Sequence, residues 1–81
     1  MKRVNCGNHF TEDRFNTFCK VLESEGEAGV YIDCTGHSLN NYEQEAYKRH
    51  LLAKYGDRIV VERNDGLCSY YYYDYKLKEV V

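Results

Sequence analysis

The sequence predicts an α+β fold, a two-layer sandwich in which two helices cover one face of a single mixed four-stranded sheet. Two segments show the three- and four-residue apolar spacing of helices, and four show the alternation or the branched and aromatic content of strands. They follow one another in the order βαβαββ. Because strand-helix-strand connections cross over right-handed, two successive crossovers leave both helices on one side of the sheet. The other face is then expected to lack a cover.

The first half of the chain is expected to form a strand, a helix and a second strand. Residues 2–6 alternate, with Val4 on one side and Arg3 on the other. Thr11 has the hydroxyl that caps a helix start, and this helix should end near residues 24–26. Its apolar side consists of Phe15, Phe18, Cys19 and Leu22. Residues 29–34, GVYIDC, are rich in branched and aromatic side chains and predict the second strand.

The second half is expected to form a helix and a hairpin. The helix should start at residue 40 or 41 and stop at Gly56. Its predicted inner side consists of Tyr42, Ala46, Tyr47 and Leu51, with His50 as a further candidate. The segments RIVVER and LCSYYYYDYKL then pair as strands, joined by residues 64–66. An Asp65-Gly66 pair readily supplies the positive backbone angles of a tight turn.

Composition limits the class of protein. The 81 residues suffice for one domain, residues 1–81, and 43% of them are apolar. No apolar run approaches the roughly 18 residues of a membrane span, and the first residues lack the apolar core of a signal peptide, so we expect a cytoplasmic protein without membrane contact. A net charge of -2 disfavours tight binding to nucleic-acid phosphates, which usually requires surplus basic residues.

Two Cys-x-x-His stretches occupy equivalent positions, each after a predicted strand and before a predicted helix. The first is CGNH and the second is CTGH; their candidate metal ligands are Cys6, His9, Cys34 and His37. If the two strands are parallel neighbours, the cysteines leave the same sheet edge about 5 Å apart. Thiolates and imidazoles at that spacing suit a tetrahedral zinc ion.

Two other interpretations of these cysteines stay open. The strand alternation alone would turn Cys6 and Cys34 inward as small packed side chains. Alternatively, a thiol near a helix start feels the positive end of the helix dipole and can become a reactive nucleophile.

The tyrosine run near the C-terminal end divides into two faces. Tyr71, Tyr73 and Tyr75 fall on one side with Leu67, Ser69 and Leu77, which we assign to the core. The other side becomes polar along its length and is assigned to the uncovered face, together with residues of the other strands. The candidate partner-binding residues there are Tyr31, Tyr70, Tyr72, Arg3, Glu62 and Asp74. Ordinary cross-strand aromatic pairing explains the same pattern without a partner.

The leading functional hypothesis is a small non-enzymatic regulatory protein, an adaptor or stoichiometric inhibitor of the kind that viruses also encode. It would dock a larger protein through the tyrosine-bearing sheet face, since tyrosine dominates many contact surfaces. A homodimer through the same face is an alternative. The rival hypotheses are a zinc-binding or reactive-thiol protein centred on the paired motifs, and a binder of single-stranded nucleic acid, which the acidic balance disfavours. No motif predicts an enzyme.

Overall fold

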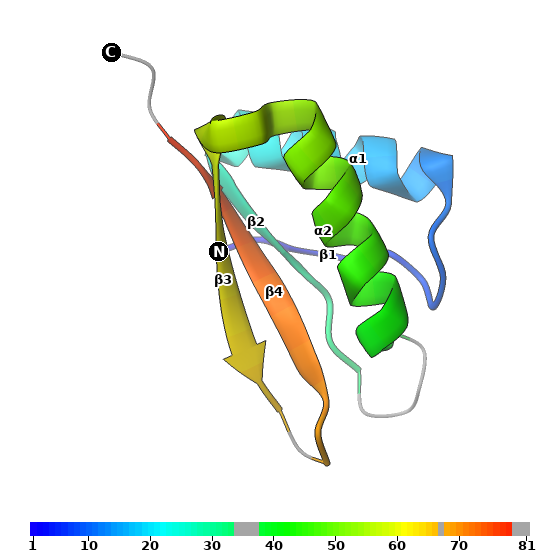
Figure 1. The fold of residues 1–81 in the computed structure, drawn as a ribbon. Helices are drawn as coiled ribbons and strands as arrows, with labels where there is room; N and C mark the ends of the chain where they lie inside the picture. Colours follow the sequence, from blue (N-terminus) through cyan, green and yellow to red (C-terminus); the bar gives the residue numbers. More distant parts are fainter. Residues whose placement is uncertain (34–37, 67, 79–81) are drawn as a thin grey trace.

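The computed structural model describes residues 1–33, 38–66 and 68–78. They form a four-stranded mixed sheet with the strand order β1-β2-β4-β3, and both helices lie on the same side of it (Figure 1). The elements are β1 (Arg3–Val4), α1 (Glu12–Glu25), β2 (Glu27–Val30), α2 (Asn41–Tyr55), the 3₁₀ turn η1 (Gly56–Arg58), β3 (Ile59–Asp65) and β4 (Tyr71–Leu77). The predicted two-layer α+β sandwich is therefore confirmed. Neither helix in these ranges has the length and apolar content needed to cross a bilayer.

Helix α1 begins and ends where the sequence predicts. The Thr11 hydroxyl accepts a hydrogen bond from the Arg14 N–H at 3.3 Å, which satisfies a free donor of the first turn. Gly26 adopts the left-handed conformation (φ 78°) and ends the helix. The buried side chains are the predicted ones, namely Phe15, Phe18, Cys19 and Leu22. The cap at Thr11 and the stop at Gly26 thus determine the ends of α1, and the apolar spacing between them determines which side is buried.

Helix α2 has the predicted bounds, but one predicted core residue is wrong. The Asn40 side chain accepts a hydrogen bond from the Glu43 N–H at 2.9 Å, and Gly56 follows the last helical residue. The inner side is formed by Gln44, Ala46, Tyr47, Leu51 and Tyr55. Tyr42 is 75% exposed instead of buried. It precedes Leu51 by nine residues, about two and a half turns, and therefore lies on the opposite side of the helix.

The sheet begins with a parallel pair and continues antiparallel. Strand β1 pairs with β2 through Arg3 and Gly29, and β4 then pairs with both β2 and β3. β1 is shorter than the predicted strand over residues 2–6. β2 starts two residues before the predicted Gly29, because Glu27 pairs with Lys76 of β4, and it ends at Val30. Cys34, the predicted end of that strand, lies outside the described residues.

The hairpin pairs as predicted, but the turn lies further along the chain. Asn64 and Asp65, expected in the turn, belong to β3 and pair with Tyr72 and Tyr71. The connection therefore runs over residues 66–70, and its Cys68 and Ser69 adopt left-handed backbone conformations. The tight Asp-Gly turn is wrong because the cross-strand register continues through Asp65.

The core lies between the sheet and both helices. The Phe18 ring of α1 meets the Tyr47 ring of α2 with a centroid distance of 5.8 Å and the Tyr75 ring of β4 at 5.6 Å, so the three elements share one centre. The hydroxyls of Tyr47 and Tyr75 are buried, and neither has a hydrogen-bond partner among the described residues. His50 is exposed on α2 but stacks on the Phe10 ring at 4.3 Å.

The connection between β3 and β4 is attached to the first turn of α2. The Asn41 side-chain oxygen accepts a hydrogen bond from the Tyr71 N–H at 3.0 Å, and its amide nitrogen donates to the Ser69 carbonyl at 2.9 Å. One side chain thus holds two backbone groups at the start of β4.

Candidate functional site

The sheet face opposite the helices carries side chains that line up across neighbouring strands. Pairing across the strands places Arg3, Gly29, Asp74 and Glu62 in the middle row. On one side lies the row Met1, Glu27, Lys76 and Val60. On the other side Tyr72 pairs with Asn64, and Tyr31 follows the end of β2, beyond the last pairing of β2 with β4. We call this surface the open face. The core assignment of Tyr73 and Tyr75 and the outward assignment of Tyr72 and Asp74 are both confirmed.

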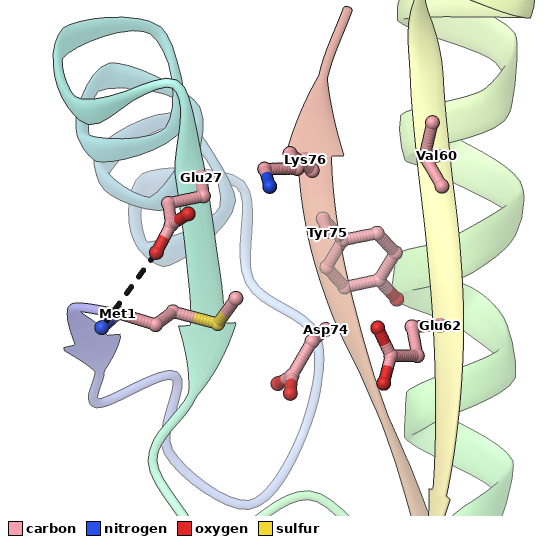
Figure 2. A pocket seen from close by; sticks show the side chains of 7 residues that line it. All are labelled: Met1, Glu27, Val60, Glu62, Asp74, Tyr75 and Lys76. Atoms are coloured by element: carbon pink, nitrogen blue, oxygen red, sulfur yellow. Dashed lines mark ion pairs between the residues drawn. The ribbon is translucent and has the colours of Figure 1, made fainter.

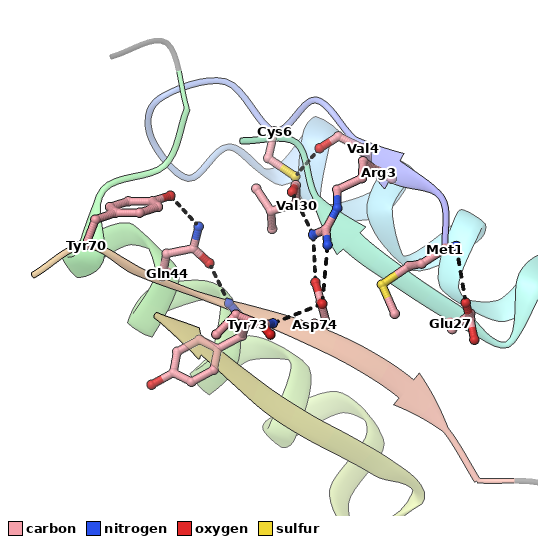
Figure 3. A network of polar contacts seen from close by, with 11 residues as sticks. Met1, Arg3, Val4, Cys6, Glu27, Val30, Gln44, Tyr70, Tyr73 and Asp74 are labelled. Atoms are coloured by element: carbon pink, nitrogen blue, oxygen red, sulfur yellow. Dashed lines mark hydrogen bonds and ion pairs between the residues drawn. The ribbon is translucent and has the colours of Figure 1, made fainter. Parts of the chain in front are cut away.

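An ion pair spans the middle of the open face. Arg3 Nη1 lies 2.7 Å from Asp74 Oδ1, Nη2 lies 3.3 Å from Oδ2, and Nη1 also donates to the Val30 carbonyl at 3.2 Å (Figure 3). The two residues belong to β1 and β4, and β2 passes between them at Gly29. A Cβ on Gly29 would lie 2.4 Å from Arg3 Nη1 and 2.7 Å from Asp74 Oδ1. Only glycine leaves room for the guanidinium to cross β2.

Two neighbours complete this arrangement. The Arg3 guanidinium lies 5.4 Å from the centroid of the Tyr72 ring, within the range of a cation-π contact. The Asn64 amide donates to Asp74 Oδ2 at 3.0 Å. Tyr31, directly after β2, is 45% exposed. The open face therefore combines a fixed polar centre with two accessible aromatic rings.

Tyr70 is the predicted binding residue whose placement departs most from expectation. Its hydroxyl donates to the Leu39 carbonyl at 2.7 Å and accepts from the Gln44 amide at 3.2 Å, so its polar tip is engaged beside α2 (Figure 3). Its ring still stacks with Tyr72 at a centroid distance of 6.3 Å. Tyr70 thus supports Tyr72 from the margin of the open face, because the connection after β3 bends it toward Leu39.

A hollow of about 100 Å³ lies over β4 on the open face (Figure 2). It is lined by Met1, Glu27, Val60, Glu62, Asp74, Tyr75 and Lys76. The carboxylate of Glu27 lies 3.6 Å from the Met1 amino group, and that of Asp74 is neutralised by Arg3. Glu62 stands directly opposite Asp74 in the sheet and forms no ion pair with the described residues. Charges of both signs line the hollow, so it does not select an ion by charge alone.

The predicted metal ligands are only partly within the described residues. β1 and β2 are parallel neighbours, as the zinc hypothesis requires. Cys6 is buried, and its thiol lies 3.5 Å from the Val4 carbonyl oxygen. His9 is exposed, with Nδ1 2.8 Å from the Asn8 side-chain oxygen. Cys34 and His37 lie outside the described residues, and the remaining part of the chain holds no group of three or more potential ligands.

The state of Cys6 bears on the reactive-thiol hypothesis. Burial raises the pKa of its thiol to about 11, and the Arg14 charge only partly opposes this shift. A neutral thiol is a poor nucleophile. The zinc hypothesis does not depend on this pKa, because a bound metal ion itself displaces the thiol proton. In this conformation Cys6 acts as a packed core side chain, and the zinc site stays a prediction.

Sequence reasoning missed a polar cluster between α2 and β4. The Glu45 carboxylate accepts hydrogen bonds from the hydroxyls of both Tyr71 and Tyr73, and the bond from Tyr73 is the largest cause of its lowered pKa. Burial, followed by the Glu45 bond, raises the pKa of Tyr73 to about 12. The alternation along the strand predicts that both tyrosine rings lie on the core side. It does not predict that Glu45 contacts them, because that contact depends on how α2 lies across β4.

Comparison with known proteins adds no relative. No protein-family model, curated protein or solved structure matches the chain.

Proposed function

We propose that this chain is a non-catalytic binding protein that docks a larger protein through the open face of its sheet. The observation that carries the proposal is the combination of Tyr31 and Tyr72 with the fixed Arg3–Asp74 pair on a face that no described element covers. Tyrosine and arginine are enriched in the cores of protein-contact surfaces and among their hot spots.

The pre-organisation of Arg3 supports this role. Its guanidinium is held by Asp74, by the Val30 carbonyl and by the Tyr72 ring, so little conformational freedom remains to be lost when a partner covers it. The neighbouring exposed Val60 and Met1 add apolar area beside this polar centre. A rigid polar centre with apolar and aromatic surroundings is typical of interface hot spots.

The test is a capture experiment followed by reconstitution. The tagged chain and its Tyr31→Ala and Tyr72→Ala variants are used to capture partners, which are identified by mass spectrometry and then purified. Tyr42→Ala is the matched control, because Tyr42 is 75% exposed on α2, on the helical side.

We expect each open-face variant to weaken binding of the purified partner by about tenfold or more, as loss of a hot-spot ring does. The Tyr42 variant should bind like the wild type. Equal binding by all four chains would contradict the proposal.

A further inference from the structure

Strand β3 is an outer strand of the sheet, with a single neighbour, β4, among the described elements (Figure 1). Its pairing is regular from Ile59 opposite Leu77 to Asp65 opposite Tyr71. It contains no proline and no bulge, two features that commonly protect exposed strand edges. The edge is therefore competent to accept another strand.

The alternation of backbone hydrogen bonds along β3 shows which residues have backbone groups at the free edge. The Lys78 N–H donates to the Arg58 carbonyl, and the Gly66 N–H donates to the Tyr70 carbonyl, each at 2.7 Å. In an antiparallel pair, residues that bond to the neighbour alternate with residues that bond away from it. The even-numbered residues from 58 to 66 therefore bond to β4. The backbone groups of Val61 and Arg63 point to the free edge.

A second copy of the chain fits this edge poorly. Antiparallel self-pairing over the whole of β3 would be centred on Glu62, the middle residue of Ile59–Asp65. Glu62 would then oppose its own copy in a pair whose Cα atoms lie about 4.5 Å apart. Like charges directly opposite each other destabilise a sheet. Glu62 thus acts against self-association in this full-length register.

We propose that the free edge of β3 binds an extended segment of a partner protein that carries a basic side chain opposite Glu62. The backbone groups of Val61 and Arg63 supply the pairing bonds, and Glu62 selects the partner by charge while it rejects a second copy. This inference rests on the proposed protein-binding function and deepens it, because it names the edge and the chemistry of the partner segment.

The experiment uses two blocked peptides of identical composition. In full antiparallel pairing, Thr-Thr-Glu-Lys-Val-Val-Thr places its lysine opposite Glu62 and its glutamate opposite Arg63. Thr-Thr-Lys-Glu-Val-Val-Thr reverses both charges. Each is titrated into the isotope-labelled full chain, and amide shifts and amide exchange are followed by NMR.

The first peptide is expected to shift and protect the Val61 and Arg63 amides, with binding about tenfold tighter than that of the reversed peptide, because two cross-strand charge pairs change sign. Equal binding by the two peptides, or no change at these amides, would overturn the proposal. The peptides do not require the open-face tyrosines. Failure here with a successful capture experiment would therefore reject the edge and keep the open face.

Three variants make the test more specific. Val61→Pro removes an outward N–H without removing a bond to β4, and is expected to abolish peptide binding in a folded chain. If that chain fails to fold, Arg63→Pro removes the other outward N–H and gives the same reading. Glu62→Val is expected to convert a monomer into a concentration-dependent dimer in sedimentation. A wild-type dimer, or a monomeric Glu62→Val chain, would refute the role given to Glu62.

Discussion

Replacing Gly29 by alanine tests the arrangement at the centre of the open face. At a position without steric conflict, a glycine to alanine change stabilises a protein by about 0.4–1 kcal/mol through the unfolded chain. Here the new Cβ would lie 2.4 Å from Arg3 Nη1 and 2.7 Å from Asp74 Oδ1, so the ion pair must separate or the strands must shift. A destabilising Gly29→Ala change therefore indicates that the Arg3–Asp74 ion pair crosses β2 at Gly29, and a stabilising change indicates that it does not.

The expected loss is modest because the pair is partly exposed, with side-chain exposures of 36% for Arg3 and 15% for Asp74. Exposed pairs contribute up to about 1 kcal/mol, and hydrogen bonds to charged groups up to about 3 kcal/mol. After the gain from the unfolded chain, we expect Gly29→Ala to lower the free energy of unfolding by about 1–2 kcal/mol.

The assay is urea denaturation followed by circular dichroism, in the wild type and in an Arg3→Ala/Asp74→Ala background. In that background Gly29→Ala should become neutral or stabilising by up to about 1 kcal/mol. Gly26→Ala is the control. It has φ 78° and open space around its Cβ position, so its cost should be the same in both backgrounds. An equal loss from Gly29→Ala in both backgrounds would refute the steric reasoning.

Three further predictions concern the cysteines, two tyrosine hydroxyls and Glu45. In native conditions a thiol reagent should modify the exposed Cys68 quickly and the buried Cys6 only after unfolding. Folding raises the Cys6 pKa from 9.0 to about 11. The stability that the neutral Cys6 thiol contributes is therefore complete below pH 9 and is lost as the pH rises toward 11. Tyr75→Phe removes a hydroxyl that has no hydrogen-bond partner among the described residues, and should be neutral or stabilising in thermal melts. Tyr73→Phe removes the hydroxyl that donates to Glu45 and should lower the free energy of unfolding by about 1 kcal/mol. A larger loss for Tyr75→Phe than for Tyr73→Phe would contradict this prediction. Folding lowers the pKa of Glu45, so the stability that its carboxylate contributes is present above pH 4.5 and is lost as the pH falls through the pKa of the folded state. Glu45→Gln should therefore reduce the loss of unfolding free energy at acid pH, measured by urea denaturation over a range of pH.

The parts of the fold that depend on local signals could be predicted from the sequence. The Thr11 cap and the Gly26 stop define α1 because each acts within one helical turn. The alternation of the tyrosine run separates core and open faces because strand side chains alternate whatever the neighbouring strand is. These signals are sufficient for the layers and for most of the open face.

The rest depends on contacts between distant segments. The Asp65-Gly66 pair favours a tight turn locally, but pairing of Asp65 with Tyr71 extends the strand beyond it. The role of Gly29 appears only when β1 and β4 flank β2, since the ion pair joins residues 71 positions apart. The engagement of the Tyr70 hydroxyl likewise depends on where Leu39 lies. None of these relations has a signature in the order of residues.

The attachment of the β3–β4 connection to α2 through Asn41 has a consequence for how the molecule opens. The side chain of Asn41 bonds to backbone groups of Ser69 and Tyr71, which lie 28 and 30 positions later in the chain. Fraying of the first helical turn therefore releases the hairpin tip at the same time, and the two segments form one cooperative unit of local unfolding.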